Sequence, residues 1–257
     1  PLFFFHPHHG TRDPLWSRGL GDVYKRQLLF MHTSSIPDDL RLAVVERRGR
    51  AHAHEGYDPQ TIALVVVDMQ NHFVAEGGLS EVPAARGIVS NINNLVDAFR
   101  RAGGVVVWVR STMSLEGRGS WPMFFDNFIA PERSRDARAG LIADTWGHEF
   151  FENLDVGPDE VIVDKDRFSP FSPGASNLDE TLKRLGVDTV FVTGTMTNVC
   201  CDSTARDAMM LDYRSVMIED ANAARTDEAH VGALSTFMSV FGDVITTREA
   251  IELLEGS

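Results

Sequence analysis

Three side chains that could carry out nucleophilic chemistry follow three short apolar segments of the chain. Asp68 comes directly after IALVVV, Lys165 comes shortly after VIV, and Cys200 follows TVFVTG at the opening of a predicted helix. A carboxylate can act as a general base and a thiol as a nucleophile, and a nearby ammonium group favours the ionised forms of both. If these side chains meet, they form a candidate nucleophile–base set.

Each of the three residues also has a simpler interpretation. An Asp after a strand often caps a helix or a turn, and Lys165, between Asp164 and Asp166, has the setting of a solvated turn charge. A Cys at an apolar helix start is often a small packed hydrophobe. A catalytic interpretation is favoured over these simpler ones because all three residues are predicted at the same edge of one sheet. The helix N-terminus is also expected to favour the thiolate of Cys200.

The elements that position these residues alternate along the chain. Short apolar runs predict strands at 62–68, 105–109, 161–163, 189–194, 215–220 and 243–246, and helices are predicted at 84–102, 175–185, 199–212, 227–240 and 247–255. Continuous β-branched runs are typical of strands buried on both faces of a parallel sheet. The alternation predicts a single three-layer α/β domain over residues 61–257, with a mainly parallel six-stranded sheet and helices on both faces. Such sheets bind ligands beyond the carboxyl ends of their strands.

Composition excludes several classes of protein. The 257 residues are 43% hydrophobic, with 24 Lys and Arg against 37 Asp and Glu and a net charge of -13. The apolar content excludes a disordered chain, no apolar run is long enough to span a membrane, and the negative charge argues against nucleic acid and anionic membranes as partners. The two cysteines, Cys200 and Cys201, are adjacent. Adjacent cysteines rarely form a good disulfide, so a reducing, cytoplasmic location is expected.

Two segments depart from the regular alternation at the start of the chain. Residues 1–30 are more basic than the rest, and their GLGDVYKRQ stretch resembles translated adapter sequence. We expect an artefact that precedes a natural start at Met31; the alternative is a disordered arm that contacts a partner subunit. Residues 31–60 are predicted to be a polar lead-in with Arg47, Arg48 and Arg50 solvated.

A long connection at 110–158 is rich in Trp, Phe and Arg and has weak periodicity. Connections of this length usually build a lid, a pocket wall or a subunit contact. Trp108, inside a predicted strand, is expected to belong to the core.

Three motifs occur in order on these elements: VVVDMQNHF, VDKDRFSPF and TGTMTNVCCDSTARDA. Together they resemble the isochorismatase-like cysteine hydrolases over about residues 61–247. The residues of the motifs are most similar to those of ureidoacrylate-type amidohydrolases. The resemblance implies a catalytic triad of Asp68, Lys165 and Cys200. It also implies a cis peptide at Thr195–Met196 and an oxyanion hole formed by the backbone amides of Met196 and Cys200.

The resemblance implies a cysteine-dependent amidohydrolase that cleaves a small amide, ureido or carbamoyl substrate through a thioester, without a cofactor. Members that act on nicotinamide carry histidine metal ligands after the second strand; residues 109–113 here contain none, so no metal is expected. Members that hydrolyse the vinyl ether of isochorismate tend to lack the cysteine, so Cys200 favours an amide. Two alternatives stay open: a vinyl ether hydrolase, and a thiol redox or binding protein built on Cys200 and Cys201. A homo-oligomer, dimer or tetramer, is also implied.

The substrate-binding candidates are less specific than the triad. His72 stands where the similar branch has a small residue or Asp, which leaves the polarity of the pocket open. Arg110, Arg118 and Arg167 could each bind a substrate carboxylate or be a surface charge. The residues predicted to contact substrate are Asn71, Phe73, Trp121, Arg167, Phe168 and Thr197.

Overall fold

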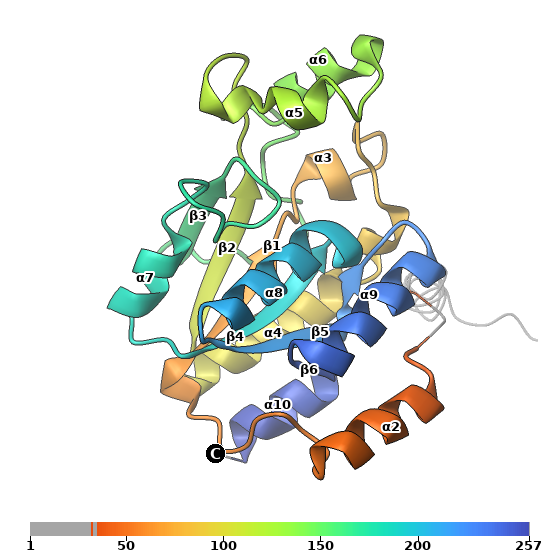
Figure 1. Cartoon of the computed structure of the whole chain (residues 1–257). Helices are drawn as coiled ribbons and strands as arrows, with labels where there is room; N and C mark the ends of the chain where they lie inside the picture. Colours follow the sequence, from red (N-terminus) through yellow and green to blue (C-terminus); the bar gives the residue numbers. More distant parts are fainter. Residues whose placement is uncertain (1–31, 33–34, 257) are drawn as a thin grey trace, which may run out of the picture.

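A six-stranded, all-parallel sheet runs through the centre of the computed structural model, which describes residue 32 and residues 35–256 (Figure 1). The strand order is β3-β2-β1-β4-β5-β6. The strands are β1 (Ile62–Val67), β2 (Val105–Ser111), β3 (Val161–Lys165), β4 (Thr189–Thr195), β5 (Arg214–Ala223) and β6 (Asp243–Ile245). The predicted fold class is confirmed. The strand order, which the residue pattern did not predict, reverses between β1 and β4, and a ligand crevice opens at such a point.

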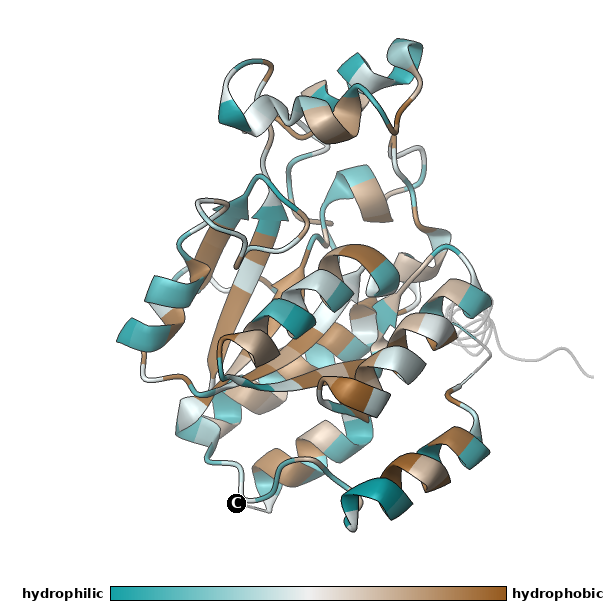
Figure 2. Cartoon of the chain, in the orientation of Figure 1, coloured by the Kyte–Doolittle hydropathy of each residue, from teal (hydrophilic) through white to brown (hydrophobic). Residues whose placement is uncertain are grey.

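Helices cover both faces of the sheet. On one face lie α4 (Val89–Ala102) and α10 (Thr247–Glu255); on the other lie α7 (Leu178–Arg184), α8 (Asp202–Met210) and α9 (Asp227–Val240). Alternate residues of β1 pack into the two layers, since Leu64 and Val66 belong to the first apolar cluster and Val65 and Val67 to the second. Burial on both faces explains why the central strand β1 is apolar along its whole length (Figure 2).

Helix boundaries follow local capping signals. The bounds of α9 and α10 are those predicted, because Thr226 and Thr246 cap their first turns and Glu249 completes a capping box with Thr246. The three other predicted helices begin three to five residues later than predicted, and α7 and α8 also end one and two residues earlier. A 3₁₀ turn (Pro83–Arg86) precedes α4, and a π-helical turn (Thr197–Cys201) precedes α8.

The lead-in contains a helix that the sequence analysis did not predict, α2 (Asp38–Arg48). Its apolar contact with the core is made by the buried Val44 and the half-buried Leu40. The prediction that Arg48 is solvated is wrong: its guanidinium pairs with the buried carboxylate of Asp243 at 2.7 Å. Arg47 and Arg50 are exposed, as predicted. The expectations for residues 1–30 lie outside the described residues.

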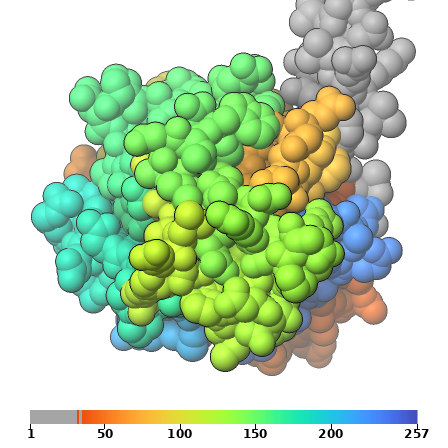
Figure 3. Space-filling model, turned by 90° about the horizontal axis from the view of Figure 1, so that it is seen from above, coloured from red at the N-terminus to blue at the C-terminus, as the bar shows by residue number. Residues whose placement is uncertain are grey.

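The long connection after β2 forms a layer above the carboxyl ends of the strands (Figure 1). It contains α5 (Pro122–Phe125) and α6 (Pro131–Ala139), and seen from above it covers much of this end of the molecule (Figure 3). Beneath it, α3 (Asn71–Val74) follows β1. Met113, Phe125 and Leu141 give the connection an apolar cluster separate from the two main ones. Of the described helices, none is long and apolar enough to cross a membrane.

Candidate active site

The Asp68 carboxylate is held at the end of β1 by a turn of the backbone. Asp68 has a left-handed φ of 52°, and its N–H donates to the carbonyl of Val109 in the neighbouring strand β2. One carboxylate oxygen accepts a hydrogen bond from the Ser111 hydroxyl at 3.0 Å, and the other accepts from the Lys165 ammonium at 2.8 Å. The ends of β1, β2 and β3 therefore meet at one carboxylate.

Ser111 is a member of this cluster that the sequence analysis did not single out. Its hydroxyl accepts from Lys165 Nζ at 2.8 Å while donating to Asp68, so it connects the two charges. Asp68 and Lys165 are 0% and 1% exposed, and a buried ion pair requires such additional hydrogen bonds. Only its position could have identified Ser111 as a member of the site. It is the last residue of β2, and β2 lies between β1, which precedes Asp68, and β3, which ends at Lys165.

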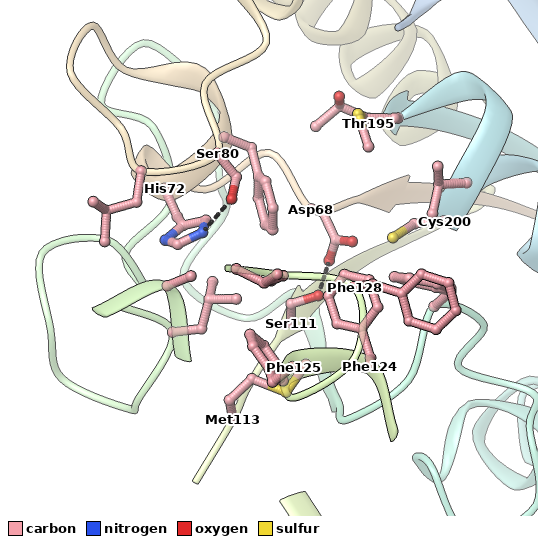
Figure 4. A pocket seen from close by; sticks show the side chains of 18 of the residues that line it. Asp68, His72, Ser80, Ser111, Met113, Phe124, Phe125, Phe128, Thr195 and Cys200 are labelled. Atoms are coloured by element: carbon pink, nitrogen blue, oxygen red, sulfur yellow. Dashed lines mark hydrogen bonds between the residues drawn. The ribbon is translucent and has the colours of Figure 1, made fainter. Parts of the chain in front are cut away.

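The Cys200 thiol reaches the cluster from the other half of the sheet. Gly194 in β4 has a φ of 114°, and a Cβ there would overlap the carbonyl oxygen of Val67, so only glycine lets the end of β4 approach β1 this closely. The Thr195–Met196 peptide that follows is cis, as predicted. The π-helical turn then brings the sulfur of Cys200 to face the Asp68 carboxylate (Figure 4).

The electrostatics of the site favour a neutral thiol. Burial raises the pKa of Cys200, the negative charge of Asp68 raises it further, and Lys165 opposes the shift. For Lys165, burial lowers the pKa, but Asp68 and Cys200 together hold it above its usual value. The expectation of a thiolate is therefore wrong for the resting site, because the lysine charge is already balanced by the aspartate. A thiol that acts as a nucleophile has to lose its proton, and the Asp68 carboxylate is adjacent to Cys200.

The two cysteines have different surroundings. Cys200 lines a cavity, whereas Cys201 is 0% exposed, belongs to the apolar core and directs its thiol to the carbonyl of Thr193 at 3.8 Å. Burial raises the pKa of Cys201 as well. Both thiols are free. A redox function would need both sulfurs to be accessible, and only Cys200 faces the cavity.

The cavity in front of Cys200 has a volume of about 520 Å³. Asp68, Ser111 and Met196 line it beside Cys200, and the connection after β2 forms the opposite side. This confirms the pocket-wall interpretation of that connection. Four of the predicted substrate-binding residues line the cavity: Phe73, Trp121, Arg167 and Phe168.

Asn71 and Thr197, the two other residues predicted to contact substrate, are not among the residues that line the cavity. The side-chain amide of Asn71 donates to the carbonyl of Trp146 at 2.9 Å and ties α3 to the long connection. The Thr197 hydroxyl is fully buried and hydrogen-bonds to Nδ1 of His230 in α9 at 2.9 Å. Both residues follow a strand end, but their side chains turn towards neighbouring elements.

His72 and the three candidate arginines are also placed by the structure. His72 lines the cavity, hydrogen-bonds to the Ser80 hydroxyl at 3.0 Å, and has its pKa lowered to about 4 by burial, so it is neutral. Arg110 and Arg118 are paired with Asp164 and Asp166 and do not line the cavity. Arg167 does line it, with its guanidinium 4.9 Å from the centre of the Trp121 ring. In the described part of the chain, no three His, Cys, Asp or Glu side chains are grouped to hold a metal ion.

Comparisons with known proteins agree with this geometry. The family model for the isochorismatase domain matches residues 62–249. The ureidoacrylate amidohydrolase RutB of Variovorax paradoxus is 35% identical over 205 residues, which cover 74% of this chain and 79% of that protein. The crystal structure of a cysteine hydrolase from Pseudomonas syringae pv. phaseolicola matches this chain with a TM-score of 0.72 at 31% sequence identity. The match covers 80% of this chain and 97% of the hydrolase chain.

A second solved structure, N-carbamoylsarcosine amidase from Thermoplasma acidophilum, has a TM-score of 0.59 at 30% identity, with 73% of this chain and 96% of that chain covered. The family match spans the whole sheet from β1 to β6 and includes every residue of the Asp68, Ser111, Lys165 and Cys200 cluster. The resemblance expected from the three motifs is confirmed, and the chain belongs to the isochorismatase family.

Proposed function

We propose that this protein is a cysteine-dependent amidohydrolase that cleaves a small amide, ureido or carbamoyl substrate. The observation that carries the proposal is the position of the Asp68 carboxylate, between the Lys165 ammonium and the Cys200 thiol at the wall of a cavity. The names of two similar proteins, a ureidoacrylate amidohydrolase and an N-carbamoylsarcosine amidase, support the same class of reaction.

The first half of the reaction transfers the acyl group to Cys200. Asp68 takes the thiol proton as the sulfur attacks the substrate carbonyl carbon. The backbone N–H groups of Met196 and Cys200 donate to the oxyanion that forms. The C–N bond then breaks, Asp68 returns its proton to the departing nitrogen, and a thioester remains on the sulfur.

The second half returns the enzyme to its starting state. Asp68 takes a proton from a water molecule that attacks the thioester; the C–S bond breaks, and the thiol recovers the proton. The product is a carboxylic acid, or a carbamic acid when the substrate is a ureide. When Asp68 is protonated, the Lys165 charge is free to stabilise the thiolate. The ammonium group therefore compensates whichever of the two groups carries the negative charge.

Release of ammonia from a panel of small amides and ureides tests this proposal. We expect turnover by the wild-type chain and an acyl adduct on Cys200 that mass spectrometry detects after rapid acid quenching. The Cys200→Ala variant should lose both. If Cys200→Ala still releases ammonia, the nucleophile is not the thiol. A wild-type chain that releases no ammonia but cleaves a vinyl ether would instead support the vinyl ether alternative.

We also infer that the chain forms a homo-oligomer. Large apolar side chains are exposed on the connection after β2, with Met123 at 69%, Phe128 at 75% and Trp146 at 56%. Large exposed apolar side chains on one connection are consistent with a protein contact surface. Light scattering after gel filtration should give the mass of a dimer or tetramer, and the mass of a single chain would contradict the inference.

A further inference from the structure

We propose that the group attached to the scissile carbonyl is bulky and apolar, an aryl ring or an alkyl chain of several carbons. Its binding site is an aromatic wall, which we define as Trp121, Phe124, Phe125 and Phe168. This inference rests on the proposed function, because it takes the Cys200 end of the cavity as the place where the carbonyl reacts.

The size of the cavity is the first argument. Its volume of about 520 Å³ falls within the range of roughly 300–1,000 Å³ that is usual for sites that enclose drug-sized ligands. A carbamoyl group alone fills only the end beside Asp68 and Cys200. Most of the cavity therefore faces whatever is attached to the carbonyl.

The aromatic wall is preformed. The Phe168 ring packs edge-to-face against both Trp121 and Phe124, with ring centres 4.7 and 5.1 Å apart, and Phe124 packs in the same way against Phe125 at 5.2 Å. Such contacts stabilise one arrangement of the rings. Figure 4 shows Phe124 and Phe125 on the side of the cavity across from the Cys200 sulfur. An apolar group thus meets ring surfaces that are already in place.

Two of the polar side chains beside this wall have partners within the protein, whereas Arg133 and Asp136, which also line the cavity, are exposed to solvent. His72 is neutral and bonded to Ser80, and the Arg167 guanidinium lies over Trp121 and is 3.3 Å from the Asp166 carboxylate. Apolar residues of the same connection, among them Met113 and Leu141, also line the cavity. A polar substituent would lose its hydration there and gain few new partners, whereas an apolar one gains by leaving water.

A graded series of primary amides tests the proposal: acetamide, propanamide, butanamide, hexanamide and 3-phenylpropanamide, with ureidoacetate as a small polar comparison. Burial of each methylene contributes about 0.8 kcal/mol, so kcat/KM should rise about fourfold per methylene until the cavity is filled. The phenyl compound should be among the best substrates. A flat or falling series, or a preference for ureidoacetate, would overturn the inference while leaving the amidohydrolase itself intact. Failure of every compound to release ammonia would instead contradict both.

Variants of the aromatic wall provide the second measurement. Phe124→Leu and Trp121→Leu should each lower kcat/KM for hexanamide about tenfold more than for acetamide. Trp146→Leu is the matched control, because Trp146 belongs to the same connection but is exposed and does not line the cavity. Its ratio of hexanamide to acetamide activity should equal that of the wild type. Equal losses on both amides in the two wall variants would contradict the proposal.

Binding can be measured separately from turnover. Calorimetry with the Cys200→Ala variant should give a Kd for 3-phenylpropanamide that is at least about thirtyfold lower than the Kd for acetamide. Binding of the two amides with the same affinity would refute the aromatic wall as a binding site, even if both are hydrolysed by the wild type.

Discussion

The chemistry of single residues in this site depends on charge balance. Asp68 and Lys165 are buried together, and the Ser111 hydroxyl connects them. The Lys165 ammonium faces both the Asp68 carboxylate and the Cys200 thiol. Burial and Asp68 raise the pKa of the thiol and Lys165 opposes the rise, so in the proposed mechanism formation of the thiolate requires the lysine.

Replacement of Lys165 by Met tests that requirement. The variant leaves Asp68 as a buried carboxylate without a counterion, and loss of one partner of a buried pair costs about 3–5 kcal/mol of unfolding free energy. The pKa of Cys200 should rise further, because the Lys165 charge that opposes the rise is gone. We expect kcat/KM to fall at least about a hundredfold and the pH profile of thiol alkylation to shift to higher pH.

Lys183→Met is the control for this variant. Lys183 forms an ion pair with Asp179 in α7, but its side chain is 63% exposed, and exposed pairs contribute little. Normal turnover and an unchanged alkylation profile in Lys165→Met would return Lys165 to the simpler interpretation of a structural charge.

The two adjacent cysteines should respond differently to substitution. Cys200→Ser should remove nearly all amide hydrolysis, because Cys200 is the thiol that faces the cavity. Cys201→Ala should retain most of it, since Cys201 packs in the core, and should instead lower the melting temperature. Iodoacetamide labelling followed by mass spectrometry checks the assignment independently. Faster labelling of Cys201 than of Cys200 would show that the nucleophile is misassigned.

At the level of secondary-structure elements, ion pairs help to attach α2 to the domain. The Asp243 carboxylate, only 3% exposed, accepts hydrogen bonds from Arg48 and from the backbone N–H of Ala53. Arg48 also donates to the carbonyl of Gly242. This one guanidinium therefore joins the end of α2 to the beginning of β6.

Arg48→Met should lower the unfolding free energy by about 3 kcal/mol, because it leaves Asp243 buried without its cation. Arg50→Met, two residues along and exposed, should change it by less than about 0.5 kcal/mol. Denaturant unfolding monitored by fluorescence measures both. If the two variants lose the same stability, the contact between α2 and β6 does not stabilise the domain.

The elements that could be predicted from the sequence are those with a continuous apolar run or a clear capping residue. The buried strands and the helices α9 and α10 have continuous apolar runs or capping residues that the sequence displays directly. The short helices α3 and α5 have four residues each, too few to show a period. The helix α2 was missed for another reason: Val44 is its only buried residue, so its apolar face is too narrow to recognise.

For the whole molecule, two buried histidines should make stability depend on pH. Burial lowers the pKa of His72 to about 4 and that of His230 to about 3, whereas both should titrate near their usual value of about 6.5 in the unfolded chain. The unfolded chain therefore binds more protons below pH 6.5, and stability is lost as the pH falls through the window between the unfolded and folded values. Each of the two histidines should lower the free energy of unfolding by about 2 kcal/mol between pH 7 and pH 5.

Denaturant unfolding at pH 7 and pH 5 measures this loss. His72→Gln should reduce the difference between the two pH values by about 2 kcal/mol, since glutamine does not titrate. His52→Gln is the control, because His52 is exposed. A His72→Gln chain with the same pH dependence as the wild type would show that His72 is not held neutral in the fold.

The sequence by itself determined the fold class, the family and the three chemical groups of the site. These follow from local signals: apolar strands buried on both faces, and motifs that contain Asp68, Lys165 and Cys200 at the strand ends. Only the tertiary structure decided which neighbours those groups have. Ser111 joins them, and Asn71 and Thr197 turn away, because strand order and backbone direction set the distances between residues far apart in the chain. The protonation of Cys200 was decided in the same way, since it depends on burial and on the sum of the nearby charges.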